Sequence, residues 1–473
     1  MADLRQEDKT MAQQAMDPEE RQAIIDAFRR PWVEEYTEKR PKSKQLFEDP
    51  RTRFSARTYR DFARGAPYPY YIEAAQGFTL RDVDGNELID FGNNATALVH
   101  GHAHPYIEQA IIGALRTGTS YSGSHIYRDR LAEMLAERMP GVEKVTFAMS
   151  GTEADMYAVR IARAYSGKDK VMWFSGGYHG TYDPVHAGPT FRGYPESVEQ
   201  DYLMADFNDK EGTERLIAEH KDQLAAVLIE PVQGTAGYIA PREDFLQFLR
   251  DVTTKYGVLL IFDEVITGFR WARGGAQEYY NVRPAADIVA MGKVMGGGLP
   301  NAAVGASDHI MEVIRSLPVE NQAQPDRRPT VPMGGTYSGY KLGCAAGIAA
   351  LELLTPEAYE RLNGLGARLI GGLKSVCSEL GVKAQVSGDA SIAGIHMTDK
   401  DVWNGEIARN VDAQLNGLVR FGLLRHGVIW GTGGLSLNTV MTEREVDEAV
   451  EALRETLLEM RPLLQRVAPE MVG

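Results

Sequence analysis

Cysteine is scarce in this sequence of 473 residues, in which only Cys344 and Cys377 occur. Two cysteines are too few for the disulfide framework of a secreted protein, so we expect a reducing, cytoplasmic compartment. Positive charge is also in the minority, because 51 lysines and arginines stand against 65 aspartates and glutamates and leave a formal net charge of −14. This balance argues against a nucleic-acid partner and against an anionic membrane surface.

Long apolar runs are missing as well. No uninterrupted apolar stretch is long enough to span a bilayer, and the N-terminus lacks the apolar core of a signal peptide. The sequence has no sustained internal repeat and no low-complexity segment. What it does have is 44% hydrophobic residues, which over this length supply a large core and more than one domain.

The stretch 257–300 contains the strongest functional signal. Its apolar run 258–262 is too short for a soluble helix and predicts a buried strand, which Asp263 follows directly. A second apolar run at 287–291 predicts another strand, and Lys293 follows it after one glycine. Ligands of open α/β sheets lie beyond the carboxyl ends of the strands, so this acid and this lysine are candidate site residues.

An acid and a lysine at two strand ends suit the chemistry of pyridoxal phosphate. Lys293 can form a Schiff base with the aldehyde of the cofactor, and Asp263 can pair with the pyridinium nitrogen, which keeps the ring an electron acceptor. Side chains alternate along a strand, so Asp263 and Val265 share one face and Glu264 takes the other. Val265 would then lie under the ring while Asp263 reaches its edge.

Five motifs in a fixed order extend this interpretation to the whole chain. They are HGHAHP at 100–105, SGTEADMYAVRIAR at 150–163, GGYHG at 176–180, FDEVITGFR at 262–270 and AMGKVMGGGLP at 290–300. Together they make the chain resemble a class III, fold-type I pyridoxal-phosphate aminotransferase. The resemblance covers roughly residues 75–460 and is to the branch that contains glutamate-1-semialdehyde aminomutase and the β-amino-acid aminotransferases.

The resemblance implies an α/β fold with a large cofactor-binding domain, whose mostly parallel sheet is flanked by helices, and a smaller α+β domain from both termini. We expect an N-terminal extension and part of the small domain at 1–90, the large domain at 91–345 and the rest of the small domain at 346–473. It also implies a homodimer with shared active sites, in which Thr336 reaches the phosphate in the site of the other subunit.

The segment Ser150-Gly151-Thr152 lies between a predicted strand at 144–149 and a predicted helix at 154–165. Free backbone N–H groups and the helix dipole make such a junction an anion site. By the resemblance, Gly151 and Thr152 bind the cofactor phosphate, with Ser150 in the same turn. The alternative from the residues alone is an ordinary helix N-cap formed by Ser150 or Thr152.

Further cofactor contacts follow from the same resemblance. Tyr178 matches the aromatic residue that stacks on the pyridine ring, a task that suits a flat side chain. His179 either contacts the cofactor or only shapes this loop. Glu230 ends a strand predicted at 225–229 and matches a second acid near the cofactor.

Two arginines are candidates for binding the substrate carboxylate. In the β-amino-acid aminotransferases an arginine of the N-terminal segment has this role, and Arg57 matches it best, followed by Arg60. The alternative is that both are solvated surface charges. Arg425 is a further candidate carboxylate ligand, for which a surface position is the alternative.

The histidines His100, His102 and His104 alternate, as metal ligands on one strand would. No cluster of cysteines or carboxylates accompanies them, and Gly101 and Pro105 favour a turn. The similar motif of the family is structural, and we assign no metal to the chain.

The remaining patterns predict further elements. Asp84-Gly85 indicates the turn of a hairpin within 78–91. The helix expected at 19–30 is interpreted as a surface extension or as a segment that packs on a partner subunit. Other expected elements are helices at 105–118, 128–138 and 342–354 and a strand at 170–174.

The sequence therefore predicts a transaminase that moves an amino group, for instance from a β- or aromatic amino acid, to a keto acid in a ping-pong reaction through Lys293. A first alternative is an aminomutase or racemase on the same fold. The aminomutases carry an asparagine at the position of Thr235 and a glutamate in the loop that matches 432–435, and this chain has neither. A second alternative, a non-catalytic sensor or structural module, is disfavoured by the intact Asp263 and Lys293.

Overall fold

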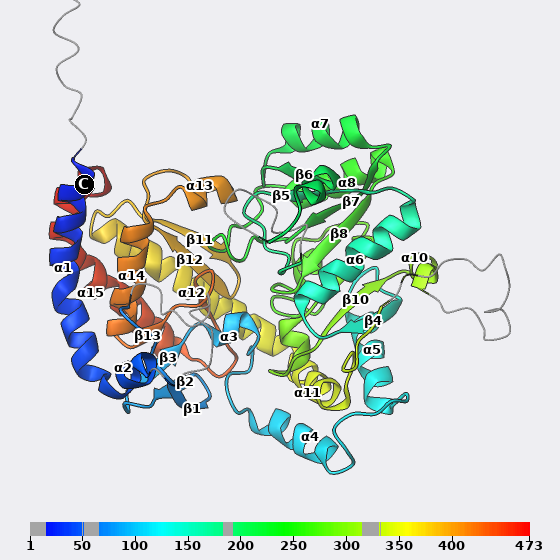
Figure 1. Ribbon diagram of the computed structural model, residues 1–473, viewed down its shortest axis with the longest axis horizontal. Helices are drawn as coiled ribbons and strands as arrows, with labels where there is room; N and C mark the ends of the chain where they lie inside the picture. The colour runs from blue at the N-terminus through cyan, green and yellow to red at the C-terminus, as the bar shows by residue number, and fades with distance from the viewer. Residues whose placement is uncertain (1–15, 50, 52–65, 183–192, 315–330, 332) are drawn as a thin grey trace, which may run out of the picture.

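The computed structural model describes residues 16–49, 51, 66–182, 193–314, 331 and 333–473 (Figure 1). Arg57 and Arg60 lie outside the described residues. The middle of the chain forms one half of the molecule, and segments from the beginning and the end of the chain lie together in the other half (Figure 1).

The larger half is built on a seven-stranded sheet. All its strands run in the same direction except β10, which is antiparallel to both its neighbours. The strands predicted in this region are confirmed to within two residues at either end. In spatial order the sheet contains β4 (Lys144–Ala148), β10 (Ala302–Ala306), β9 (Ile288–Met291), β8 (Leu259–Glu264), β7 (Leu224–Ile229), β5 (Lys170–Phe174) and β6 (Tyr202–Ala205).

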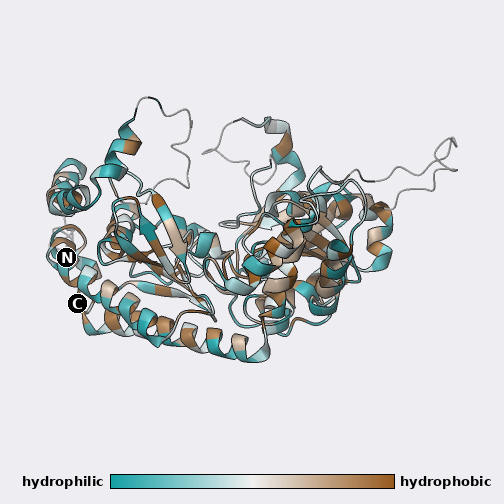
Figure 2. Cartoon of the chain, turned by 90° about the horizontal axis from the view of Figure 1, so that it is seen from below, coloured by the Kyte–Doolittle hydropathy of each residue, from teal (hydrophilic) through white to brown (hydrophobic). Residues whose placement is uncertain are grey.

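Both faces of this sheet are covered. In β7, Ala226 and Leu228 join the apolar cluster beneath helix α6 (Gly151–Ser166), whereas Val227 and Ile229 join the cluster on the opposite face. A strand with two buried faces needs apolar residues at every position, which is why these strands are continuous apolar runs in the sequence. Figure 2 shows the helices on the outside of the molecule as alternating teal and brown along their length.

The helices of the larger half include all those predicted there, with ends shifted by a few residues. Helix α8 ends at Gly257, whose φ of 64° forms a left-handed cap and turns the chain directly into β8. The other elements are α4 (Pro105–Leu115), α5 (Ile126–Arg138), α7 (Lys210–His220), α8 (Phe245–Tyr256), α9 (Gly275–Tyr279), α10 (Asp308–Met311) and α11 (Lys341–Glu352), with the 3-10 helices η2 (Glu196–Asp201), η3 (Lys293–Gly296) and η4 (Glu312–Ile314).

The smaller half contains two sheets. The predicted hairpin is present, and Gly85 in its turn has a φ of 92°. Its strand β3 pairs in parallel with β13, so residues near the two ends of the chain complete one sheet together. The first sheet has the order β1 (Ile72–Gln76), β2 (Thr79–Asp82), β3 (Glu87–Asp90) and β13 (Val428–Ile429), and the second has β11 (Gln385–Asp389), β12 (Ile392–His396) and β14 (Leu435–Ser436).

Long helices pack on these two sheets. Helix α15 begins with a capping box in which Thr442 and Glu445 bond to each other's backbone N–H groups, and it contacts α12 along the outside of this half. The helices here are α1 (Pro18–Lys39), α2 (Pro41–Glu48), α3 (Asn93–Thr96), α12 (Pro356–Glu379), α13 (Gly405–Arg409), α14 (Ala413–Arg425) and α15 (Glu443–Val467), with η6 (Pro469–Met471).

Helix α1 is longer than predicted and lies elsewhere. The sequence predicted an end at residue 30, but the helix continues through Pro31 to Lys39. Trp32 and Tyr36 lie beyond the proline and are buried against Phe421 of α14, with ring centroids 6.0 and 5.7 Å away. This packing offsets the hydrogen bond that the proline removes. Helix α1 is therefore not a detached surface extension but packs on its own chain, and a contact with a partner subunit stays a prediction.

A buried arginine connects the two halves. Arg270 follows β8, and its side chain is completely buried. Its Nη2 donates to the carbonyl of Thr96 at 2.8 Å and its Nη1 to that of Leu437 at 3.0 Å. Burial lowers the pKa of this guanidinium to about 10.

The helices were also compared with the requirements for crossing a membrane. None within the described residues is at once long enough and apolar enough to do so.

Replacing Trp32 by alanine tests the docking of α1. The indole is 4% exposed, donates to Oε2 of Glu459 at 2.8 Å and lies against the guanidinium of Arg425. We expect Trp32→Ala to lower the free energy of unfolding by about 3–5 kcal/mol, the usual cost of removing a buried aromatic side chain. Urea unfolding followed by circular dichroism measures this.

The matched control is Glu34→Ala, because Glu34 is exposed on the same helix. It should change the free energy of unfolding by less than about 0.5 kcal/mol. Similar small effects of both substitutions would show that α1 is not docked in solution.

Candidate active site

The carboxylate of Asp263 is buried near the end of β8, in the middle of the larger sheet. Its Oδ2 lies 2.8 Å from Nδ1 of His179, and its Oδ1 accepts a hydrogen bond from the backbone N–H of Val265 at 3.0 Å. These contacts fix the direction of the carboxylate and stabilise charge on it.

Glu264 takes the opposite face of β8, as the alternation of the strand predicted. Its two oxygens accept hydrogen bonds from the N–H groups of Ala276 and Gln277, both at 2.9 Å, and the hydroxyl of Thr267 also donates to it. Burial raises the pKa of Glu264 to about 7. Its partners are all structural, so the two neighbouring acids of this motif serve different sites.

Lys293 begins η3 immediately after β9 and Gly292. Strands β8 and β9 are parallel, with Asp263 opposite Ala290, so the lysine and the aspartate leave the sheet at the same edge. The backbone φ of Lys293 is 47°, a left-handed conformation that is costly for a residue with a side chain. Such local strain is retained where the surroundings determine the position of a functional group.

Val265 lies between the lysine turn and the start of α6. A methyl group added to Gly151 would come within 2.9 Å of Cγ1 of Val265, and one added to Gly292 within 3.2 Å of the same atom. The two glycines therefore let both turns approach Val265 closely. Residues far apart in the sequence therefore meet here.

The turn before α6 contains the N-cap that was one of the two interpretations given for it, and phosphate binding there stays a prediction. Ser150 is the N-cap of the helix, and its Oγ accepts a hydrogen bond from the N–H of Glu153 at 3.3 Å. Thr152 instead faces the next loop, because its Oγ1 accepts from the N–H of Thr181 at 3.2 Å. Gly180 is in the left-handed region, with a φ of 95°, and packs directly on Thr152. The N-terminus of α6 and the 176–180 loop thus form one surface.

Glu230 holds the 176–180 loop in place. Its Oε2 accepts a hydrogen bond from the N–H of Tyr178 at 2.8 Å, and its Oε1 accepts from the N–H of Gly234 at 3.1 Å. Burial and the charge of Asp263 raise the pKa of Glu230 to about 7. Above this fixed backbone, Tyr178 is 37% exposed.

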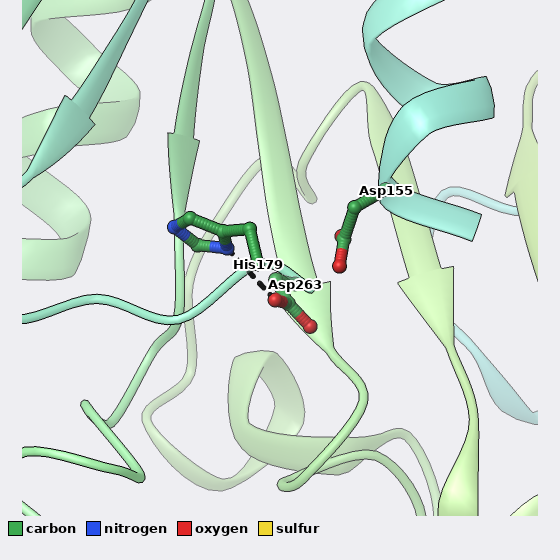
Figure 3. A group of neighbouring side chains, drawn as sticks. All are labelled: Asp155, His179 and Asp263. Atoms are coloured by element: carbon green, nitrogen blue, oxygen red, sulfur yellow. Dashed lines mark hydrogen bonds and ion pairs between the residues drawn. The ribbon is translucent and has the colours of Figure 1, made fainter. Parts of the chain in front are cut away.

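Asp155 lies in the same buried cluster of side chains as Asp263, His179 and Glu230, and it was not predicted from the sequence. It projects from α6 toward Asp263 and His179 (Figure 3), and one ligand-type atom from each of the three lies within 4.8 Å of the others. Burial, followed by the charge of Asp263, raises the pKa of Asp155 well above its usual value, and the charge of Lys293 opposes this. A signal for it existed, because Asp155 lies on the apolar face of α6 that also carries Ala158 and Val159.

Two carboxylates and an imidazole also form a donor set for a cation. The positive charge that acts on this group comes from Lys293 of the chain itself. We assign no metal ion to it.

The model of the aminotransferase class-III family matches residues 62–457. The chain belongs to the class III aminotransferase family.

Relatives and solved structures agree with this family. The chain is 35% identical over 421 residues to glutamate-1-semialdehyde 2,1-aminomutase of Methanosphaera stadtmanae, which covers 87% of this chain and 96% of that one. It is 37% identical to an omega-transaminase from Sphaerobacter thermophilus, with a TM-score of 0.81 and coverage of 89% and 98%. A β-phenylalanine aminotransferase from Variovorax paradoxus is 32% identical, with a TM-score of 0.82 and coverage of 93% and 98%.

The predicted fold-type I architecture is thereby confirmed, and the chain is a pyridoxal-phosphate-dependent enzyme. The cluster fits this cofactor chemically. It offers a buried carboxylate for a ring nitrogen, an amine for an aldehyde, an exposed aromatic ring and a helix N-terminus for a phosphate. Nε2 of His179 is buried without a hydrogen-bond partner among the described residues, so the site retains polar capacity for a ligand.

Not every predicted site residue of this class III chain lies in the cluster. Thr336 is exposed in the turn before α11, where Ser338 Oγ accepts from the N–H of Gly335 at 2.9 Å. Its predicted role concerns the other subunit and stays a prediction. The predicted roles of Arg57 and Arg60 also stay predictions, because both lie outside the described residues.

Arg425 has neither of the positions considered for it. Its side chain is 13% exposed and forms ion pairs with Glu35 at 2.6 Å and Glu459 at 2.8 Å. Its guanidinium lies 4.5 Å from the ring centroid of Trp32. The expected surface position is therefore wrong, and its donors are used by carboxylates of the chain that dock α1.

The histidine motif of the class III chain is part of a turn, as its glycine and proline favoured. His100 contacts the hydroxyl of Thr439 and the carbonyl of Ala350, both at 2.9 Å. His102 contacts Oδ2 of Asp90 at 2.7 Å. The ring of His100 thus joins α11 of the larger half to Thr439, whereas His102 bonds to the end of β3 in the smaller half.

The two positions that separate aminomutases from this chain lie close to each other in space. A methyl group on Gly433 would come within 2.0 Å of the carbonyl oxygen of Gly234, which directly precedes Thr235. The loop 432–435 therefore packs on the loop that follows Glu230. Thr235 and the loop 432–435 therefore belong to one region of the structure.

Gly151→Ala tests whether the close packing around Val265 is needed for the cofactor. The added methyl group must displace Val265 or the first turn of α6, and such overpacking typically costs about 1–3 kcal/mol. We expect pyridoxal phosphate to bind at least about tenfold more weakly. Titration of the apoprotein, followed by visible absorbance, measures the affinity.

Gly113→Ala is the matched control, because a methyl group there would meet no atom within 4 Å. The double variant Gly151→Ala/Val265→Ala should recover part of the affinity. If the single and double variants bind equally weakly, the contact with Val265 is not the cause.

Proposed function

We propose that the enzyme is an aminotransferase that moves an amino group from an amino acid, such as a β- or aromatic amino acid, to a keto acid. The observation that carries this proposal is the convergence of Lys293 and Asp263 at one edge of the sheet. Transamination is supported by the likeness to the omega-transaminase of Sphaerobacter and the β-phenylalanine aminotransferase of Variovorax. The Methanosphaera relative supports the alternative of an aminomutase, against which Thr235 and the acid-free loop 432–435 stand.

Each residue of the cluster has a role in this proposal. Bound pyridoxal phosphate supplies an electron-accepting ring that stabilises negative charge at the substrate carbon. The amine of Lys293 holds the cofactor and afterwards moves a proton to and from that carbon. Asp263 balances positive charge at the ring nitrogen, and His179 and the N–H of Val265 keep its carboxylate in place.

The other assignments concern the edges of the cofactor and the substrate. Gly151 and Thr152 bind the phosphate at the N-terminus of α6, where the helix dipole favours an anion. Tyr178 stacks on the ring, and Glu230 positions it through its backbone. Arg57, with Arg60 as the second candidate, binds the substrate carboxylate.

We further propose that residues 1–90 and 346–473 contribute to the small domain and 91–345 form the large one. The enzyme is proposed to be cytoplasmic, which its two free, buried cysteines support. It acts as a homodimer with shared active sites, in which Thr336 reaches the phosphate of the partner's cofactor.

An exposed apolar patch supports the dimer. Ile126 is 78% exposed and Tyr337, beside Thr336, is 56% exposed. Tyr121 is joined to α11 by a hydrogen bond from Nζ of Lys341 at 2.9 Å, and His125 is joined to the carbonyl of Gly339 at 3.0 Å. Exposed apolar surface on neighbouring elements is typical of a protein interface. The patch consists of Tyr106, Ile112, Leu115, Tyr121, Ile126 and Tyr337.

The amino-transfer reaction is tested with a panel of α-, β- and ω-amino donors and with pyruvate or 2-oxoglutarate as acceptor. We expect an amino product that requires both a donor and a keto acid. Lys293→Ala should reduce kcat by about 10²–10⁴-fold or more, because the proton-transferring amine is lost. Lys374→Ala, which removes an exposed lysine of α12, should have no effect. Conversion of an amino substrate without any keto acid would contradict transamination and favour the mutase or racemase.

The dimer is tested with Ile126→Glu. A charge in the middle of an apolar interface is costly to bury, so the variant should become monomeric and lose activity in parallel. Light scattering coupled to gel filtration measures the mass. Leu458→Glu is the matched control, because Leu458 is 49% exposed on α15, outside the patch. A wild-type monomer with full activity would refute the shared active site.

A further inference from the structure

Asp155 is a buried acid that the proposed mechanism does not use. Its side chain belongs to α6 and is 1% exposed. Its Oδ1 is buried and has no hydrogen-bond partner among the described residues. An isolated carboxylate without partners is strongly disfavoured inside a protein, so this position requires either a counter-charge or a proton.

The neighbours of Asp155 favour the proton. One carboxyl oxygen of Asp155 lies within 4.8 Å of one of Asp263, and two buried carboxyl groups this close are stable together only if one of them carries a proton. Asp263 already accepts from the N–H of Val265 on Oδ1 and contacts Nδ1 of His179 through Oδ2. Both contacts stabilise charge on Asp263, which leaves the proton on Asp155.

We propose that Asp155 is a positioning residue that carries a proton and donates it in a hydrogen bond to the carboxylate of Asp263. The two acids together then carry one negative charge at the cofactor site. The inference rests on the proposed function, in which Asp263 faces the ring nitrogen of the cofactor. Asp155 acts from the side of α6, while His179 acts from the loop after β5, so the carboxylate is held from two directions (Figure 3).

The pH dependence follows from the groups that face Asp155. Asp263 and Glu230 approach from the ends of β8 and β7, Lys293 from the turn after β9, and His179 and Tyr182 from the loop after β5. Burial and Asp263 raise the pKa of Asp155, so the buried group keeps its proton where the unfolded chain, with an ordinary value of 3.8, has lost it. Asp155 therefore lowers the stability of the folded state progressively as the pH rises above that value.

The test compares the wild-type holoenzyme with Asp155→Asn and Asp155→Ala. Asparagine retains an uncharged donor of the same shape, whereas alanine removes it. We expect infrared difference spectra at neutral pH to show a protonated-carboxyl band that Asp155→Asn lacks. The value of kcat for Asp155→Asn should exceed that for Asp155→Ala by about tenfold, the effect of one hydrogen bond to a charged group.

Two pH-dependent readouts separate positioning from a merely structural role. The excess of Tm of Asp155→Asn over wild type should grow as the pH rises from about 4, where the unfolded chain begins to lose its proton. In the wild-type enzyme, kcat should fall at alkaline pH as Asp155 ionises. This alkaline limb of the pH profile should be absent from Asp155→Asn. Glu264→Gln is the matched control, since it removes a buried acid on the other face of β8 and should leave that limb unchanged.

The inference is overturned if the band is absent from wild type, or if Asp155→Asn and Asp155→Ala have equal kcat and an unaltered pH profile. A stoichiometric cation in the purified protein that replaces the proton would also overturn it. If no donor is transaminated but the band and the stability difference are present, the proposed function fails while the proton on Asp155 stands. If transamination occurs without them, this inference alone is wrong.

Discussion

The rest of the site depends on the buried carboxylate of Asp263 and on the hydrogen bonds that hold it. A carboxylate inside a sheet of apolar strands is stable only when its oxygens are satisfied, and here a histidine from one loop and a backbone amide from the next satisfy them. The same histidine belongs to the loop that Glu230 holds by the N–H of Tyr178. One buried charge thus fixes the position of two loops and of the aromatic ring that they carry.

The site concentrates acids that would be unfavourable elsewhere. Asp155, Glu230 and Asp263 are all buried at one edge of the sheet, and the pKa values of the first two are raised, mainly by burial. Such groups gather where a protein needs a defined field rather than maximal stability. The strained backbone of Lys293 is a second cost at the same place. The fold tolerates the buried acids and the strained backbone of Lys293 because the strands beneath them are packed on both faces.

The sequence predicted the parts of the fold and site that local patterns determine. Strands of the central sheet were recognisable because burial on two faces requires continuous apolar runs, and the aspartate and lysine followed from their positions at strand ends. Asp155 was missed because a periodic pattern identifies a buried helix face but does not show which polar group lies opposite. The continuation of α1 past Pro31 was missed because it depends on packing against α14, near the other end of the chain. The ion pairs of Arg425 were missed because one partner, Glu35, lies 390 residues earlier in the sequence.

The buried guanidinium of Arg270 has a consequence for how the molecule comes apart. Its acceptors are carbonyl groups of Thr96 and Leu437, which belong to segments on either side of the larger sheet in the sequence. If either segment detached, a guanidinium that is charged at neutral pH would be left in an apolar interior without compensation. Unfolding of one half alone therefore costs free energy, because it leaves the charge of Arg270 without its acceptors. The two halves should lose their structure in a single cooperative event, although each has sheets and helices of its own.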